Sequence, residues 1–363
     1  MKKRIKLFEP ISDKKEQRAV QKVLSSGFWA SGAGVGNVLR FENRFKKFVG
    51  ARSCVAVNSG TAALHLALSL ADIKGKEVIL PSLSFISTAH AVLYNGGKPI
   101  FVDVNHDTLC MDPDAVTEKI SDKTQLILPV HFAGMPANLS KLMRIAKEHN
   151  CLLIEDAAHA CGATLQKKMI GSHGDFVCFS FHPVKNLAMP TGGLISINHS
   201  KHKKMKEILN ARRWCGITNR KEVSYNIKEL GWNYYMNEFS AAIGLVQLSK
   251  LKRLNRLRKK ISKRYYDEIS VDIKMPYNEN CAYHFYWILI KNRDAFRKKM
   301  NENGIETGIH YKPIHTMTMY QNGTNLPITE KAGKQIVSIP THPNLSDADV
   351  DRIVSTVNAF AKG

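Results

Sequence analysis

The feature that most constrains the fold is a regular alternation of short apolar runs with helix-forming segments between residues 54 and 197. Seven runs have the length and apolar character of buried strands: Cys54–Val57, Val78–Leu80, Pro99–Val102, Leu126–Val130, Cys151–Glu155, Phe176–Phe181 and Leu194–Ile197. Helical patterns lie between several of them, at Ala62–Leu70, Ser84–Tyr94, Pro113–Ile120 and Leu139–His149. This alternation is typical of an α/β fold with a mainly parallel central sheet flanked by helices.

The pattern changes after about residue 241. A long basic helix leads to a strand candidate at Tyr286–Ile290, a helix near Arg293–Asn303 and a last helix from Ser346 to about Phe360. A chain of 363 residues is long enough for two domains. We therefore predict a large α/β domain over residues 1–240 and a smaller C-terminal α+β domain over residues 241–363.

The chain is strongly basic, with 53 Lys and Arg against 31 Asp and Glu and a formal net charge of +22. The densest basic run, residues 250–264, has leucines at helical spacing, which predicts an amphipathic helix with a basic outer face. Such a face can be merely solvated, can attract a diphosphate substrate, or can bind nucleic acid weakly. No nucleic-acid-binding motif accompanies it, so nucleic acid is not expected to be the main ligand.

The other compositional signals are bland. The seven cysteines have no C-x-x-C spacing, and the histidines lack the spacing of a metal site, so we expect reduced thiols and no metal. No apolar stretch reaches 18 residues, which argues against a membrane span. The basic start, residues 1–6, has no apolar signal core after it, so we expect an untargeted cytoplasmic chain.

The segment from Phe179 to Lys185 places one lysine just after a buried strand candidate. A lysine beside apolar walls loses hydration, which lowers the pKa of its ammonium and frees the amine as a nucleophile. A Schiff base with pyridoxal phosphate (PLP) requires such an amine. The alternative is an ordinary surface lysine at a strand end.

Two further segments fit a phosphate-bearing cofactor. Gly60, Thr61 and Ala62 open a helix after the first strand, where backbone N–H groups bind phosphate, although a plain turn is equally compatible. Asp156 ends a strand at the edge where α/β sheets bind ligands, and it could pair with a protonated pyridine nitrogen or cap a helix. The glycine-rich residues 31–36 do not follow a strand, so we predict a flexible loop and not an NAD site.

Three more side chains are candidates for the cofactor site. Ser180 and His182 flank the end of the lysine strand, and a hydroxyl there could bind the cofactor phosphate. Phe85 starts a helix after a strand and could stack on the pyridine ring, or could be a core aromatic.

The ordered set of motifs resembles the DegT family of PLP-dependent nucleotide-sugar aminotransferases, which have the aspartate-aminotransferase fold (fold type I). The similar segments run nearly from end to end of the chain: 28–32, 58–66, 81–85, 155–160, 180–185, 231–238, 310–315 and 338–343. The large domain is thereby identified as a PLP-binding domain.

The resemblance implies a role for each matching residue. Lys185 and Asp156 would be catalytic: Lys185 would hold PLP covalently and move a proton at the substrate carbon, and Asp156 would hold the pyridine nitrogen. His159 would contact the ring or its phenolic oxygen, and Phe85 would stack on the ring. The phosphate would be held by Gly60, Thr61, Ala62 and Ser180, and by Asn233 of a neighbouring subunit, in a homodimer with shared active sites.

The expected activity is transfer of an amino group from glutamate to a keto group of a nucleotide-linked 6-deoxy sugar, in amino-sugar or polysaccharide biosynthesis. One alternative is a PLP-dependent sugar dehydratase or lyase, but the family's dehydratases have histidine where Lys185 stands. The other is a non-catalytic protein that binds nucleic acid through residues 250–264.

Three positions depart from the family pattern. His159 stands where the family often has glutamine, residues 189–191 lack the usual acid, and Tyr235 replaces an arginine. These departures bear on substrate choice more than on the chemistry.

Overall fold

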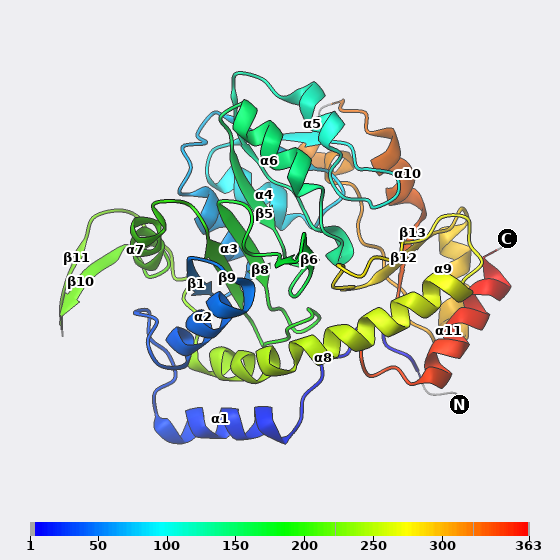
Figure 1. Cartoon of the computed structure of the whole chain (residues 1–363), viewed down its shortest axis with the longest axis horizontal. Coiled ribbons are helices and arrows are strands. Elements are labelled where there is room, and N and C mark those ends of the chain that lie inside the picture. The colour runs from blue at the N-terminus through cyan, green and yellow to red at the C-terminus, as the bar shows by residue number, and fades with distance from the viewer. Residues whose placement is uncertain (1–3, 222, 322, 362–363) are drawn as a thin grey trace.

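The computed structural model describes residues 4–221, 223–321 and 323–361, so residues 1–3 of the basic start lie outside it. A seven-stranded sheet forms its centre (Figure 1). The strands are β1 (Ser53–Val57), β2 (Glu77–Pro81), β3 (Lys98–Val102), β4 (Thr124–Ile127), β5 (Leu152–Asp156), β8 (Phe176–Ser180) and β9 (Gly193–Ile197). Their order is β1-β9-β8-β5-β4-β2-β3, and only β9 runs antiparallel to its neighbours. The predicted mainly parallel sheet is confirmed.

Helices cover both faces of this sheet, as the continuous apolar strands require. Cys178 of β8 belongs to the apolar cluster that contains α3, whereas the next residue, Phe179, packs edge-on against Phe45 of α2 with ring centroids 5.0 Å apart. The helices are α1 (Lys14–Ser26), α2 (Gly36–Val49), α3 (Gly60–Leu68), α4 (Ser87–Tyr94), α5 (Pro113–Lys119), α6 (Leu139–Glu148), α7 (His202–Arg212), α8 (Glu238–Glu268), α9 (Arg293–Glu302), α10 (Pro327–Gln335) and α11 (Asp347–Phe360).

The short strands form three two-stranded sheets outside the central one. These strands are β6 (Thr164–Leu165), β7 (Lys168–Met169), β10 (Ile217–Lys221), β11 (Ser224–Ile227), β12 (Tyr286–Leu289) and β13 (Ile336–Ile339). Figure 1 shows the β10–β11 hairpin extending away from the body of the molecule, beyond α7. The β12–β13 pair lies in the C-terminal part, in contact with α9 and α10.

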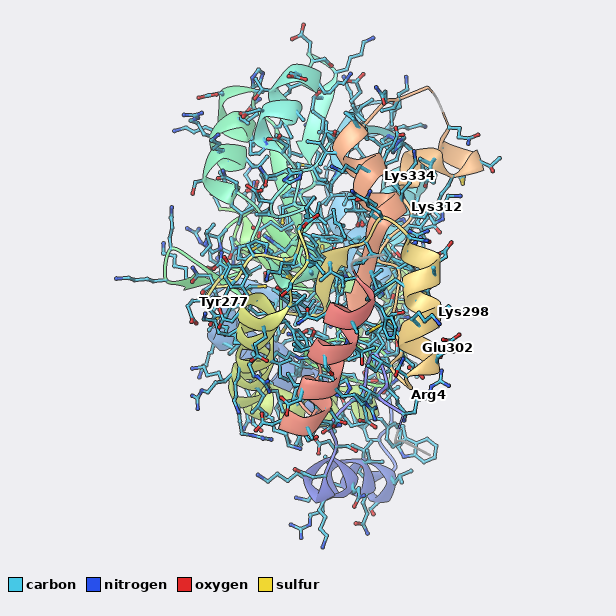
Figure 2. The ribbon with its side chains drawn as sticks, turned by 90° about the vertical axis from the view of Figure 1, so that its right-hand side faces the viewer. Arg4, Tyr277, Lys298, Glu302, Lys312 and Lys334 are labelled. Carbon is cyan, nitrogen blue, oxygen red and sulfur yellow. The ribbon has the colours of Figure 1, made fainter. Side chains whose placement is uncertain are left out.

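The C-terminal part is tied to the rest by α8 and by the chain's own start. Figure 1 shows α8 running from beside α2 to α11. Ile5 N donates to Gly304 O (2.8 Å), and Figure 2 shows Arg4 next to α9 on this side of the molecule. The division of the chain at residues 240 and 241 stays a prediction.

Several predicted boundaries differ from the structure by one to three residues, and two of these differences have a local physical reason. Strand β4 ends at Ile127 and not at residue 130, because Pro129 has no N–H to continue the ladder. Helix α4 begins at Ser87 and not at residue 84, since the Ser84 hydroxyl bonds the Thr88 hydroxyl (2.7 Å) and residues 82–86 form a non-helical turn.

The basic run of α8 is helical as predicted, but two of its cations point inward. Lys250 is buried and bonds both carboxylate oxygens of Glu16 (2.7 Å each), which fastens α1 to α8. Arg258 is buried and donates to the backbone carbonyls of His284 (3.3 Å) and Thr341 (3.2 Å). The outer face is therefore less basic than the sequence suggests.

The loop of residues 31–36 packs against a buried ion pair between Arg213 and Glu42. Arg213, at the end of α7, donates to Glu42 Oε1 of α2 (2.6 Å) and to Ala56 O of β1 (2.8 Å), and both side chains are almost fully buried. A Cβ at Gly34 would lie 1.9 Å from the Arg213 guanidinium, so a glycine is needed for this close approach. The glycines of this loop thus serve packing.

We predict that Glu42→Ala lowers the free energy of unfolding by about 3–5 kcal/mol, because it leaves the buried Arg213 charge without its partner. Chemical denaturation of the purified protein measures the change. The exposed Glu207→Ala on α7 serves as a control and should change the stability little. Equal stability of the two variants would contradict the prediction.

Candidate active site

A cavity of about 320 Å³ opens at the carboxyl ends of β5 and β8. Most of the predicted cofactor residues line it: Gly60, Thr61, Phe85, Asp156, His159, Ser180, His182 and Lys185. Two do not: Ala62 is buried in α3, and Asn233 is exposed elsewhere on the chain. The fold thus brings together side chains that come from four separate segments of the sequence.

The first turn of α3 forms one end of the cavity. The first N–H groups of a helix have no partner within it, and here they belong to Gly60 and Thr61. A Cβ at Gly60 would lie 2.7 Å from the Ser180 Cβ, so glycine keeps this end open. An anion can therefore approach these N–H groups together with the Ser180 hydroxyl. The N–H of Ala62 donates to the N-cap Ser59 Oγ (3.1 Å), which leaves it a weaker candidate.

Asp156 is buried at the end of β5, and its carboxylate is held in place from two sides. Thr88 of α4 donates to Oδ2 (2.8 Å), and Ala158 N donates to Oδ1 (3.1 Å). Burial raises the pKa of the Asp156 carboxyl, while these two hydrogen bonds and the charge of Lys185 act in the opposite direction. The oriented carboxylate can pair with a cationic nitrogen in the cavity.

Lys185 reaches the same cavity from the segment after β8. Its Nζ lies 3.4 Å from His284 Nε2. Burial lowers the pKa of the Lys185 ammonium to about 8, and the nearby Asp156 charge opposes this shift. An amine with such a pKa is partly free at neutral pH, as a nucleophile or a general base requires.

Neutral aromatic rings surround the lysine. His159 Nε2 lies 3.1 Å from the Tyr311 hydroxyl, and the His159 and His284 ring centroids are 4.7 Å apart. Burial, and then the charge of Lys185, hold the pKa of both histidines well below the ordinary value. The same two causes lower the pKa of His310 to about 4. A neutral His284 can accept a hydrogen bond from the Lys185 ammonium.

Phe85 and His182 lie at the exposed rim of the cavity. Phe85 is 55% exposed, with its ring centroid 5.9 Å from that of Tyr311, so it is not a core aromatic. His182 is also exposed and lines the cavity beside Lys185. An open Phe85 ring is available to stack on a planar ligand.

The sequence reading missed three residues of the site: Thr88, Tyr311 and His284. Thr88 lies in α4, three residues after Phe85, but its role depends on Asp156, which is 68 residues away in the sequence. Tyr311 lies in the 310–315 segment that carries the resemblance. His284 stands in an apolar stretch without any motif, so no local signal pointed to it.

Two other kinds of site have no candidate in the described part of the chain. No group of three or more His, Cys, Asp or Glu side chains there could hold a metal ion. No helix there combines the length and the apolar character that a bilayer crossing needs.

Comparison with known proteins gives consistent matches. Residues 10–358 match the DegT/DnrJ/EryC1/StrS aminotransferase family. The chain is 32% identical to the spore coat polysaccharide biosynthesis protein SpsC of Bacillus subtilis, over 98% of this chain and 96% of that protein. It superposes on Helicobacter pylori PseC, an aminotransferase of pseudoaminic acid biosynthesis, with a TM-score of 0.94 and 26% identity, over 99% of this chain and all of PseC. Spr1654 of Streptococcus pneumoniae, in its PMP-form, gives a TM-score of 0.93 at 26% identity, over 99% and 98% of the two chains.

We predict that the Lys185 amine becomes reactive with a midpoint near pH 8, because burial lowers its pKa to about 8. Asp156→Asn removes a charge that raises this pKa, so the midpoint should move to lower pH. Trinitrophenylation of Lys185 in protein freed of PLP, measured by peptide mass spectrometry across a pH series, gives both midpoints. Labelling of the exposed Lys298 in the same samples corrects for the reagent. The charge coupling would be refuted by identical midpoints.

Proposed function

Because the chain belongs to the DegT/DnrJ/EryC1/StrS family of PLP-dependent sugar aminotransferases, we propose that it moves an amino group from glutamate to the keto carbon of a nucleotide-linked 6-deoxy sugar. The observation that carries the proposal is one cavity that contains the Lys185 amine, the Asp156 carboxylate and the N-terminus of α3. A lysine at this position favours amino transfer over dehydration.

The cavity fits PLP. The α3 N-terminus suits its phosphate, and the buried Asp156 carboxylate suits its pyridine nitrogen. His159 Nδ1 is buried without a hydrogen-bond partner among the described atoms, which leaves it available to a ligand. When bound, PLP supplies an electron sink that stabilises negative charge at the reacting carbon.

The chain's own residues then bind, orient and move a proton. Gly60, Thr61 and Ser180 hold the phosphate, and Phe85 covers one face of the ring. Asp156 keeps the nitrogen end fixed, since Thr88 and Ala158 leave its carboxylate little freedom. Lys185 takes and returns the proton at the substrate carbon, a task for which a pKa near neutrality is best suited.

We assign His284 to the positioning of Lys185. Its Nε2 lies 3.4 Å from Nζ, and Arg258 of α8 holds the backbone carbonyl of the same residue. Phe8 stacks on the ring, with centroids 5.3 Å apart and an interplanar angle of 19°. The ring is thus fixed by the start of the chain and by α8, and it presents a neutral acceptor to the lysine.

Two observations support the proposed substrate: the net positive charge of the chain and its similarity to a polysaccharide biosynthesis protein. A chain of net charge +22 attracts a sugar that carries a diphosphate. The relationship to a spore coat polysaccharide biosynthesis protein supports a role in polysaccharide biosynthesis, which we place in the cytoplasm.

We propose a homodimer with shared active sites. Asn233 is exposed, and its backbone carbonyl accepts from Asn58 Nδ2 (3.3 Å). Within the described residues its side-chain amide forms no hydrogen bond, so the amide is available to a neighbouring subunit. The segment that precedes it in the chain exposes large apolar side chains, which free surfaces seldom do. They are Val223, Tyr225, Ile227 and Leu230 of the β10–β11 hairpin and the segment after it.

We predict that Lys185→Ala abolishes the glutamate half-reaction and that His284→Phe slows it about tenfold, because the phenyl ring keeps the volume but removes the acceptor. The loss of visible cofactor absorbance after mixing with glutamate measures the rate. His106→Ala, on the exposed surface, is the control and should react like the unmodified protein. A screen of keto-sugar nucleotides then tests the acceptor. Absence of any reaction with glutamate would contradict the proposed donor.

If each active site contains residues of both subunits, two inactive variants should restore activity when they form a mixed dimer. Lys185→Ala and Asn233→Ala should each be inactive alone, whereas a mixture should recover about a quarter of the wild-type sites, since half of the dimers pair one chain of each kind and contain one intact site. Activity after unfolding and refolding the two variants together measures this recovery. The same variants refolded separately and then combined cold are the control. No recovery after joint refolding would argue against shared sites.

A further inference from the structure

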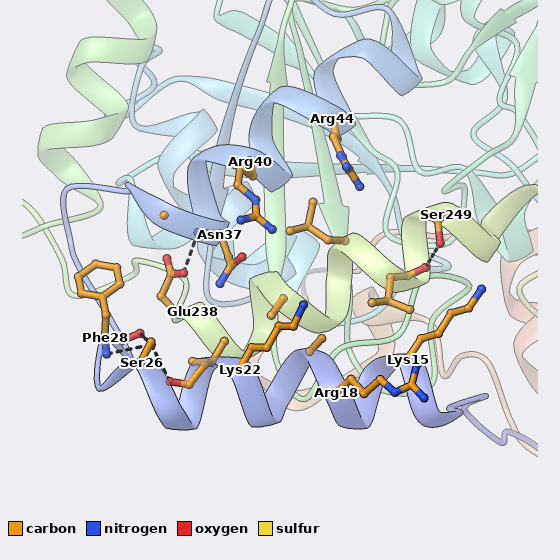
Figure 3. Close-up of a pocket in the computed structure, with 16 residues that line it drawn as sticks. Lys15, Arg18, Lys22, Ser26, Phe28, Asn37, Arg40, Arg44, Glu238 and Ser249 are labelled. Carbon is orange, nitrogen blue, oxygen red and sulfur yellow. Dashed lines mark hydrogen bonds between the residues drawn. The ribbon is translucent and has the colours of Figure 1, made fainter.

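A groove between α1, α2 and α8 collects cations that the proposed catalysis does not use. Its volume is about 650 Å³, and it shares no lining residue with the catalytic cavity. Figure 3 shows Lys22 reaching up from α1 and Arg40 and Arg44 reaching down from α2 into the same gap. Lys15 and Arg18 line it from the α1 side.

These five cations have no counter-ions of their own. Within residues 4–221, 223–321 and 323–361, none of them forms an ion pair or a side-chain hydrogen bond. Several outer cations of α8 differ, because they lie beside carboxylates: Lys260 by Asp347, Lys263 by Asp267, and Arg264 by Glu268 and Asp351. The groove therefore gathers five positive charges that no carboxylate of the described residues pairs with.

The one acid in the lining does not neutralise it. Glu238 is buried, and its carboxylate accepts from the N–H groups of Asn37 (2.7 Å) and Val38 (3.3 Å) at the start of α2. Its charge is thus engaged by the N-terminus of a helix. The cations face one another in a concave space, which costs repulsion that a bound anion would relieve.

The groove walls are fixed before any ligand arrives. Glu16 ties α1 to Lys250 and Gln247 of α8, each at 2.7 Å, and α2 is tied to the core by the Glu42–Arg213 pair. Such preorganisation reduces the entropic cost of binding.

The lining also suits a base. Phe28 lies at one end of the groove and is 43% exposed, so one face is available for stacking. The volume lies within the range of small-molecule sites, and arginine matches phosphate geometry. We propose that the groove is a second, non-catalytic site for a nucleoside di- or triphosphate, with its phosphates between Lys22, Arg40 and Arg44 and its base against Phe28.

Calorimetric titration of the full chain with UDP, dTDP and inorganic pyrophosphate tests the site. Lys22→Ala combined with Arg40→Ala should weaken one class of binding by about tenfold or more. Phe28→Ala should weaken nucleotide binding about tenfold and leave pyrophosphate unchanged. The matched control, Lys298→Ala with Lys331→Ala, removes the same charge from exposed positions elsewhere and should have little effect.

Three results would overturn the assignment. These are unchanged isotherms in the groove variant, an equal loss in the control variant, and equal binding of nucleotide and pyrophosphate with no effect of Phe28→Ala. The variants replace exposed side chains, so thermal unfolding should confirm an intact fold. The result does not depend on the proposed reaction, because a nucleotide bound in the catalytic cavity would remain as a separate class of sites.

Discussion

The site depends on two opposite charges, Asp156 and Lys185, which are buried at the carboxyl ends of two neighbouring strands of the central sheet. Strands β5 and β8 are parallel neighbours, and Asp156 lies opposite Cys178 in their register. The segments that follow the two strands therefore leave the sheet at the same end. Asp156 ends one strand, and Lys185 follows the other. Burial raises the pKa of the carboxyl and lowers that of the amine, and each charge partly offsets the effect on the other.

The C-terminal part of the chain completes this arrangement. The lysine meets His284, and the His159 ring meets the Tyr311 hydroxyl. Arg258 of α8 places its guanidinium in the core, where it donates hydrogen bonds to the backbone carbonyls of His284 and Thr341. The neutral rings keep polar acceptors next to the amine without adding a charge, which preserves the lowered pKa that the chemistry uses.

The positions of the positive charges in the structure differ from what their density along the sequence suggests. The basic run of α8 looked like the main cationic surface in the sequence, yet Lys250 and Arg258 turn inward and several others face carboxylates. The five cations of the groove come from α1 and α2, which contain no such dense basic run. The packing of these helices, and not the local density of basic residues, brought them together.

The sequence by itself determined the seven central strands and the four helices between them over residues 54–197, because burial on both faces demands continuous apolar runs that can be read directly. It also pointed to Lys185, Asp156 and Gly60, since a strand end or a helix start next to a chemical side chain is a local signal. Thr88 and His284 were beyond its reach: their partners lie 68 and 99 residues away. Those contacts, the inward turn of Arg258 and the cationic groove arise only when distant segments pack, and that packing alone decided them.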